Sequence, residues 1–85
     1  MAAYKIQFKV SIRKDLDFIP KHDLQRILER IGSLADNPRP AGCEKLSGQE
    51  RYRVRQGNYR IIYSVHDFEL TVLVVKVGHR GQVYR

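Results

Sequence analysis

The sequence predicts a small α+β domain, in which a mainly antiparallel sheet carries a helical hairpin on one face, with the order β-α-α-β-β-β over residues 1–85. Three observations predict this fold class. Apolar and polar residues alternate near the N-terminus, two stretches with helical spacing follow, and the second half is rich in β-branched and aromatic residues. A chain of 85 residues has room for a single domain with a thin core.

The first two elements are a strand and a short helix. Alternation of apolar with polar residues is typical of a half-buried strand, and its apolar positions are Tyr4, Ile6, Phe8 and Val10. Ser11 then offers an N-cap for a helix that ends at Pro20. The apolar positions of this helix have the spacing i, i+4, i+7 and are Ile12, Leu16 and Ile19.

The second helix has the clearest periodicity in the chain. Its apolar residues form one stripe, which consists of Leu24, Ile27, Leu28, Ile31, Leu34 and Ala35. Asn37-Pro38 closes the helix, because proline cannot continue the hydrogen-bond ladder and restricts the residue before it. Two helices joined by a proline turn are therefore expected to form a hairpin that covers one face of the sheet.

The second half predicts three more strands. Arg51–Gln56 and residues 59–65 form a hairpin around the tight turn Gly57-Asn58. A turn at Asp67-Phe68 leads to residues 70–77, which are so uniformly apolar that we expect a central strand covered on both faces. Gly78-His79-Arg80-Gly81 interrupts this pattern, and residues 82–85 form a short extended tail.

The net charge of +7 is concentrated in the second half of the chain. Residues 45–85 hold eight Lys/Arg against three Asp/Glu, and residues 1–44 hold eight against six. Such a surplus of positive charge favours a polyanionic binding partner such as nucleic acid, although an anionic membrane or an acidic protein would explain the charge equally well. No apolar run is long enough for a membrane span and the N-terminus lacks a signal peptide's apolar segment, so we expect a cytoplasmic protein.

Three arginines are expected to converge on the open face of the hairpin. A two-residue turn pairs Arg55 with Arg60 and places Arg53 on the same face, whereas Tyr52 and Val54 point toward the helices. Facing arginines repel each other, and no acidic residue in either strand relieves them. An anion between the guanidinium groups explains this arrangement, and phosphate suits their forked donors best. The alternative is a solvated strand face that only discourages aggregation.

The C-terminal run adds further polar candidates. Glycines on both sides of His79 and Arg80 allow a sharp turn that exposes both side chains, and Tyr84 follows shortly afterwards. Neither a metal-ligand spacing nor a phosphate-binding glycine loop is present, and Cys43 is the only cysteine. We therefore expect no metal and no cofactor.

At this point the sequence resembles the RelE toxins of type II toxin–antitoxin modules. The resemblance extends over almost the whole chain, and its most specific part is the closing run. The runs that carry it are Lys45-Leu46-Ser47-Gly48, Tyr52-Arg53-Val54-Arg55, Gly57-Asn58-Tyr59-Arg60-Ile61-Ile62-Tyr63 and Val77-Gly78-His79-Arg80 with Val83-Tyr84.

The resemblance implies a metal-independent endoribonuclease that enters the ribosomal A site, cleaves mRNA there and inhibits translation. In that family the RNA 2′-hydroxyl attacks the neighbouring phosphate and leaves a 2′,3′-cyclic phosphate. The resemblance also implies a cognate antitoxin as partner. The resemblance places the family's catalytic positions at Arg60, Arg80 and Tyr84, and its pair of substrate-binding basic residues at Arg53 and Arg55. To these we add His79 as a catalytic candidate and Lys45 and Arg51 as substrate-binding candidates.

One departure from the family concerns the general base. Relatives carry lysines where this chain has Arg53 and Arg55, and arginine does not give up its proton in proteins. Tyr84 or His79 then remains as the base, and the sequence does not decide between them. Two other functions stay open: a non-enzymatic inhibitor of DNA gyrase of the related ParE type, and an inactive toxin-derived binding module.

Overall fold

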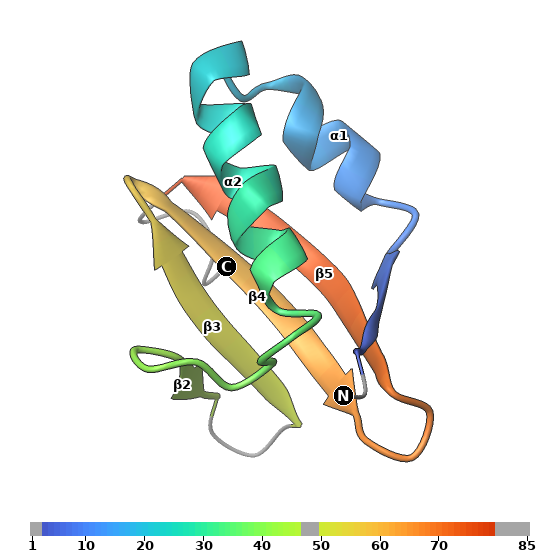
Figure 1. Cartoon of the computed structure of the whole chain (residues 1–85). Helices are drawn as coiled ribbons and strands as arrows, with labels where there is room; N and C mark the ends of the chain where they lie inside the picture. Colours follow the sequence, from blue (N-terminus) through green and yellow to red (C-terminus); the bar gives the residue numbers. More distant parts are fainter. Residues whose placement is uncertain (1–2, 47–49, 80–85) are drawn as a thin grey trace.

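The computed structural model describes residues 3–46 and 50–79 and has the predicted α+β architecture. Two helices lie across one face of a five-stranded sheet with the order β1-β5-β4-β3-β2 (Figure 1). β1 runs parallel to β5, and all other neighbours are antiparallel. The elements are β1 (Lys5–Phe8), α1 (Ile12–Asp17), α2 (Lys21–Ser33), β2 (Glu44–Lys45), β3 (Arg51–Gln56), β4 (Tyr59–His66) and β5 (Thr71–His79).

The helical hairpin forms as predicted, with differences at its ends. Ser11 occupies the N-cap position of α1, but its side chain makes no capping hydrogen bond because its backbone is already helical. α2 ends at Ser33, several residues before Pro38, and the following turn is tightened by hydrogen bonds from residue i to i−3. The Ser33 hydroxyl also donates to the Arg30 carbonyl oxygen at 2.6 Å. Of the predicted stripe, Leu28 stays 43% exposed at the margin of the helix.

Two strand boundaries differ from the prediction. β1 ends at Phe8, and Val10 is 94% exposed because the chain already turns there toward α1. β5 continues through Gly78 and His79, which pair with Arg60 and Tyr59 of β4. The prediction that this run breaks the strand was therefore wrong for its first two residues, since the start of β4 provides a partner for each of them. A glycine is tolerated in a strand that has such a partner.

The sheet buries its two faces to different extents. The main core lies between the sheet and the helices, where Ile12, Ile27, Ile31, Leu34, Val54, Ile61, Tyr63, Val72, Val74 and Val77 are almost fully buried. Burial of each aliphatic side chain of this size contributes about 1.5–3 kcal/mol. On the opposite face, Ile62 and Val75 form a smaller cluster with Leu46 and Leu73. This second face, which we call the open face, also carries the arginines of β3.

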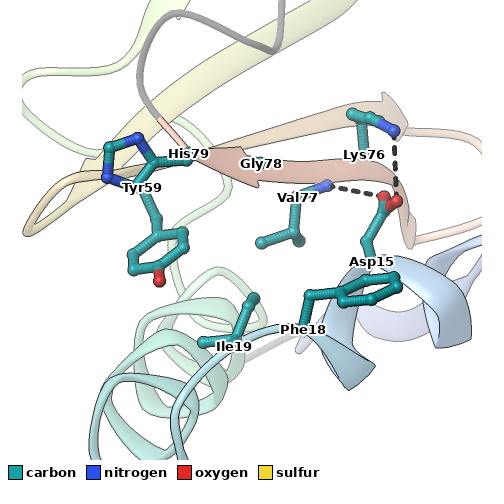
Figure 2. Close-up of a pocket in the computed structure, with 8 residues that line it drawn as sticks. All are labelled: Asp15, Phe18, Ile19, Tyr59, Lys76, Val77, Gly78 and His79. Carbon is teal, nitrogen blue, oxygen red and sulfur yellow. Dashed lines mark hydrogen bonds and ion pairs between the residues drawn. The ribbon is translucent and has the colours of Figure 1, made fainter.

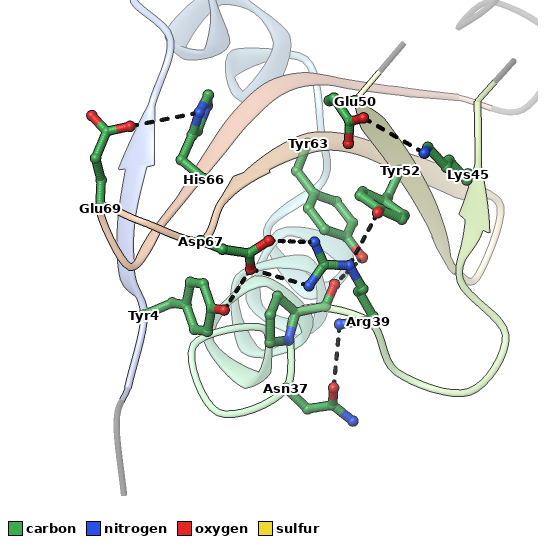
Figure 3. Close-up of polar contacts among 11 residues, drawn as sticks. Tyr4, Asn37, Arg39, Lys45, Glu50, Tyr52, Tyr63, His66, Asp67 and Glu69 are labelled. Atoms are coloured by element: carbon green, nitrogen blue, oxygen red, sulfur yellow. Dashed lines mark hydrogen bonds and ion pairs between the residues drawn. The ribbon is translucent and has the colours of Figure 1, made fainter. Parts of the chain in front are cut away.

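A polar network ties the connection after α2 to the far end of the sheet (Figure 3). The Arg39 guanidinium donates to both carboxylate oxygens of Asp67 at 3.2 and 3.0 Å, and its Nε donates to the Tyr52 hydroxyl at 3.0 Å. The Tyr4 hydroxyl donates to Asp67 at 2.7 Å. The hydrogen bonds from Arg39 and Tyr4 lower the pKa of Asp67 below its usual value. The network therefore holds segments from both halves of the sequence together.

Candidate nucleic-acid interface

The hairpin of β3 and β4 places the predicted arginines as the register requires. Arg55 lies directly opposite Arg60, and Gln56 lies opposite Tyr59, so Gly57-Asn58 is the two-residue turn. Arg53 lies two residues from Arg55 on the same face of the strand. Tyr52 and Val54, the residues that precede Arg53 and Arg55 on this strand, are buried on the side of the helices, as predicted.

Arg60 has unusual neighbours on the two flanking strands. It pairs with Arg55 on one side and with Gly78 on the other. Glycine has no side chain, so β5 contributes no side chain opposite Arg60 at this pairing.

The structure corrects the prediction that the arginines lack an acidic neighbour. Glu44 lies opposite Arg53 in the short strand β2, and its carboxylate accepts a charge-assisted hydrogen bond from the Arg53 guanidinium. This hydrogen bond lowers the pKa of Glu44 below its usual value, and the positive charges of Arg55 and Arg60 lower it further. An ionised carboxylate therefore lies within the electrostatic reach of all three arginines. The Glu44 carboxylate therefore accounts for the positive charge of Arg53 at this position, and no bound anion is needed to explain it.

The two other predicted substrate-binding residues lie beside this cluster. Arg51 precedes Arg53 by two residues on β3, lies opposite Ser64 and is exposed. Lys45 belongs to β2 and forms an exposed ion pair with Glu50 at 3.6 Å (Figure 3). The positive charges thus follow β3 along the open face, with the carboxylates of β2 and its neighbouring loop at one side.

His79 lies at the end of β5, where it lines a pocket of about 460 Å³. Its ring meets the Tyr59 ring edge-to-face, with the ring centres 5.4 Å apart. Figure 2 shows both rings above the connection that follows α1, with Phe18 on the other side of the hollow. His79 is exposed, as predicted, but as a strand residue and not as part of a turn.

The remaining predicted catalytic residues, Arg80 and Tyr84, lie outside the described residues, so their positions stay predictions. Within residues 3–46 and 50–79, no group of three or more His, Cys, Asp and Glu side chains is arranged to hold a metal ion. Neither of the two described helices is long and apolar enough to cross a membrane.

Sequence reasoning missed the roles of Glu44, Tyr59 and Asp15. A strand of two residues has no periodicity, so nothing in the sequence marks Glu44 as a partner of Arg53. Tyr59 could have been noticed, because the first residue after a two-residue turn lies at the end of the sheet. The contact of Asp15 with β5 spans more than sixty residues and has no local signal.

Comparison with known proteins identifies the family. Residues 6–84 match the sequence model of the ParE toxin of the type II toxin-antitoxin system parDE. The chain belongs to this family. Toxin RelG of Mycobacterium tuberculosis is 31% identical over 86 residues, which cover 96% of this chain and 97% of RelG. The RelE/ParE superfamily, whose members include both ParE and RelE toxins, thus accounts for nearly the full length.

Solved structures of RelE proteins share the fold. The RelE–RelB complex of Pyrococcus horikoshii matches with a TM-score of 0.83 and 32% identity, over 96% of this chain and 99% of that one. The toxin–antitoxin complex RelBE2 of Mycobacterium tuberculosis matches with a TM-score of 0.81 and 28% identity, over 92% and 99% of the two chains. The family resemblance that the sequence indicated is confirmed, and the chain is a type II toxin of RelE/ParE type.

Proposed function

We propose that this toxin is a ribosome-dependent endoribonuclease that cleaves mRNA in the ribosomal A site. The observation that carries the proposal is the pair Arg55 and Arg60, which face each other across the hairpin beside Gly78, with Arg53 next to them. Close positive charges are unfavourable in a fold unless they serve an anion. RNA phosphate matches the forked donors of such a cluster.

The chemistry requires positive charge more than any other group. When the RNA 2′-hydroxyl attacks the neighbouring phosphate, negative charge accumulates on the equatorial oxygens, and guanidinium groups that are already in position stabilise it. Because the nucleophile belongs to the substrate, we propose a metal-independent reaction without a cofactor. We assign Arg60 to the reacting phosphate, in line with the resemblance to RelE toxins, and Arg53 and Arg55 to the flanking phosphate.

Proton transfer is assigned to residues near the end of β5. His79 lies one residue beyond Gly78, the partner of Arg60, and an imidazole ring can both accept and donate a proton. Tyr84 is the alternative base, and Arg80 assists the leaving group. Both assignments rest on the resemblance to RelE toxins.

We also propose a cognate antitoxin that covers the arginines, because related toxins have been crystallised with antitoxins. An acidic segment on these arginines would compete directly with RNA. Affinity for RNA should then depend steeply on salt, since phosphate contacts release counterions. Affinity for the antitoxin should depend on salt less, since apolar contacts provide much of such binding.

Primer extension on a defined mRNA in a purified translation system tests the proposal. The wild-type chain should produce cuts within codons only when ribosomes are present. Arg60→Ala should lower the cleavage rate about 10²–10³-fold, as for the loss of one donor to a developing oxyanion. Arg26→Ala on α2 removes the same charge away from the site and should cut normally. Normal cleavage by folded Arg60→Ala would show that the site is wrongly assigned.

A second function is favoured by the family match, which names ParE. A ParE-type toxin inhibits DNA gyrase without cleaving RNA. A supercoiling assay with purified gyrase and no ribosomes separates the two functions, because only a gyrase inhibitor should block supercoiling there. Inhibition of gyrase without mRNA cleavage would replace the ribonuclease proposal.

A further inference from the structure

Apart from His79, the residues that line the pocket at the end of β5 have no role in the proposed cleavage reaction. The pocket has a volume of about 460 Å³ and lies between the C-terminal end of α1 and the ends of β4 and β5 (Figure 2). Its lining includes Asp15, Phe18 and Ile19 from the helical side, and Tyr59, Val77 and His79 from the sheet.

Three aromatic rings border this pocket. Tyr59 and His79 form an edge-to-face pair with an angle of 86° between the rings, which leaves ring surface directed toward the hollow (Figure 2). Phe18 approaches from the opposite side and is 86% exposed. A phenylalanine this exposed contributes little to the core, and an exposed aromatic group beside a pocket is the kind of surface on which a flat ligand stacks.

A carboxylate lies at one end of the pocket. Asp15 Oδ1 accepts a hydrogen bond from Lys76 Nζ at 3.1 Å, and Asp15 Oδ2 accepts one from the Val77 N–H at 3.2 Å. These two contacts hold the side chain in place. An ionised carboxylate offers about four lone-pair positions, so each oxygen keeps capacity for an N–H donor of a ligand. Flat rings with N–H groups on their edges are a property of nucleobases.

The pocket lies on the helix-covered face of the sheet and the arginine cluster lies on the open face, but both are at the same end of the sheet. Tyr59 precedes Arg60 on β4, and His79 follows Gly78, which is the partner of Arg60. Consecutive strand residues point to opposite faces, about 3.3 Å apart along the chain. The pocket therefore opens at the same end of the sheet as Arg60, where β4 begins, β5 ends and the two helices are joined (Figure 1).

We propose that this pocket binds one unstacked nucleobase of the RNA whose phosphates lie on the arginine cluster. The base stacks on Phe18 and on the Tyr59–His79 pair, and an N–H group on its edge donates to Asp15. Single-stranded nucleic acids are recognised by basic residues that hold the backbone and by aromatic rings that receive splayed bases. Here the RNA strand passes around the end of the sheet, from the arginines on one face to the pocket on the other. The proposal rests on the proposed ribonuclease function and adds a base-binding subsite to it.

Binding of a short single-stranded RNA, measured by fluorescence anisotropy, tests the subsite. Phe18→Ala should bind the RNA roughly 5- to 150-fold more weakly, as for the loss of one base–aromatic stack. Phe68→Ala is the matched control, because Phe68 is also fully exposed but lies in the turn between β4 and β5, outside the pocket lining. It should bind like the wild type. Both variants should unfold at the same urea concentration as the wild type, since neither side chain is buried.

A second probe separates stacking from an indirect effect of Phe18. The same RNA is prepared as a series in which each nucleotide in turn lacks its base. For one member of the series, the affinity of the wild type should be lower than for the intact RNA. The factor should equal the one by which Phe18→Ala weakens binding of the intact RNA. The wild type and Phe18→Ala should bind this member with equal affinity. Equal losses on every member would overturn the proposal, since Phe18 would then contact the RNA backbone or act through the fold.

Two further outcomes distinguish this proposal from the one on which it rests. If the wild type binds RNA, Arg60→Ala weakens binding and Phe18→Ala does not, the subsite is wrong while the arginine cluster stands; the exposed Phe18 then serves a protein partner. If the wild type does not bind RNA, or binds it independently of Arg60, the subsite proposal fails, and the primer-extension assay with ribosomes decides separately whether the ribonuclease function stands.

Discussion

The carboxylate of Glu44 occupies the position where the arginine cluster would hold an RNA phosphate, so its removal should strengthen RNA binding. The Glu44 carboxylate accepts a hydrogen bond from the Arg53 guanidinium, and its lowered pKa keeps it ionised at neutral pH. A phosphate that binds Arg53 must displace it. Glu44→Gln keeps the size of the side chain and removes the negative charge that competes with a phosphate at Arg53, so we expect one more phosphate contact.

The size of the effect follows from counterion release. Each phosphate neutralised on a single strand contributes about 0.7 to the slope of log affinity against log salt. Glu44→Gln should steepen this slope by about 0.7, so its advantage over the wild type grows about 2.6-fold when salt falls from about 200 to about 50 mM. Anisotropy titrations with a single-stranded RNA at several salt concentrations measure the slope directly.

Glu29→Gln is the charge-matched control for Glu44→Gln. Glu29 is exposed on α2, which covers the face of the sheet opposite the arginines. Equal slopes for the two variants would mean that only total charge matters. Weaker RNA binding by Glu44→Gln would refute the competition between carboxylate and phosphate, because Glu44 would then hold Arg53 in its binding position.

Two further predictions concern stability. Ile61→Ala removes a side chain that has 0% exposure between the sheet and the helices, and it should lower the free energy of unfolding by about 2–5 kcal/mol, measured by urea denaturation. Leu28→Ala, at a position that is 43% exposed, should lower the free energy of unfolding by less than half as much. Equal losses for the two variants would contradict the assigned core. The pKa of Asp67 is lowered in the folded state because Arg39 and Tyr4 donate hydrogen bonds to its carboxylate. Ionisation of Asp67 therefore stabilises the fold at pH values above the usual aspartate pKa of about 3.9. This stabilisation is lost as the pH falls through the lower pKa of the folded state. Asp67→Asn should therefore be less stable than the wild type at pH 7, and the difference should shrink by pH 3; a difference that stays constant with pH would show that its charge has no such role.

Much of the hairpin could be predicted because its information is local. The pair Gly57-Asn58 determines a two-residue turn, and this turn alone places Arg55 opposite Arg60. The apolar stripe of α2 likewise identified Ile27, Ile31 and Leu34 as core residues, because helical periodicity repeats within a few residues. These features depend on neighbours in sequence, and the structure confirms them.

The charge environment of the site could not be predicted in the same way. Glu44 reaches Arg53 only because β2 joins the edge of the sheet, and a strand of two residues carries no pattern. The end of β5 was predicted too early, since whether Gly78 and His79 stay in the strand depends on the partners that β4 offers. A β-pairing is a contact between distant segments, and the sequence of one segment does not specify its partner.

By itself, the sequence of this toxin determined its fold class, its helical hairpin, the register of the arginines and its family. Only the tertiary structure decided what surrounds those arginines: a carboxylate of β2 on one side and a glycine of β5 on the other, with an aromatic pocket on the opposite face at the same end of the sheet. The physical reason is the range of the interactions. Periodicity and turns act over a few residues, whereas Glu44–Arg53, Asp15–Val77 and Tyr59–His79 meet only after the sheet has assembled.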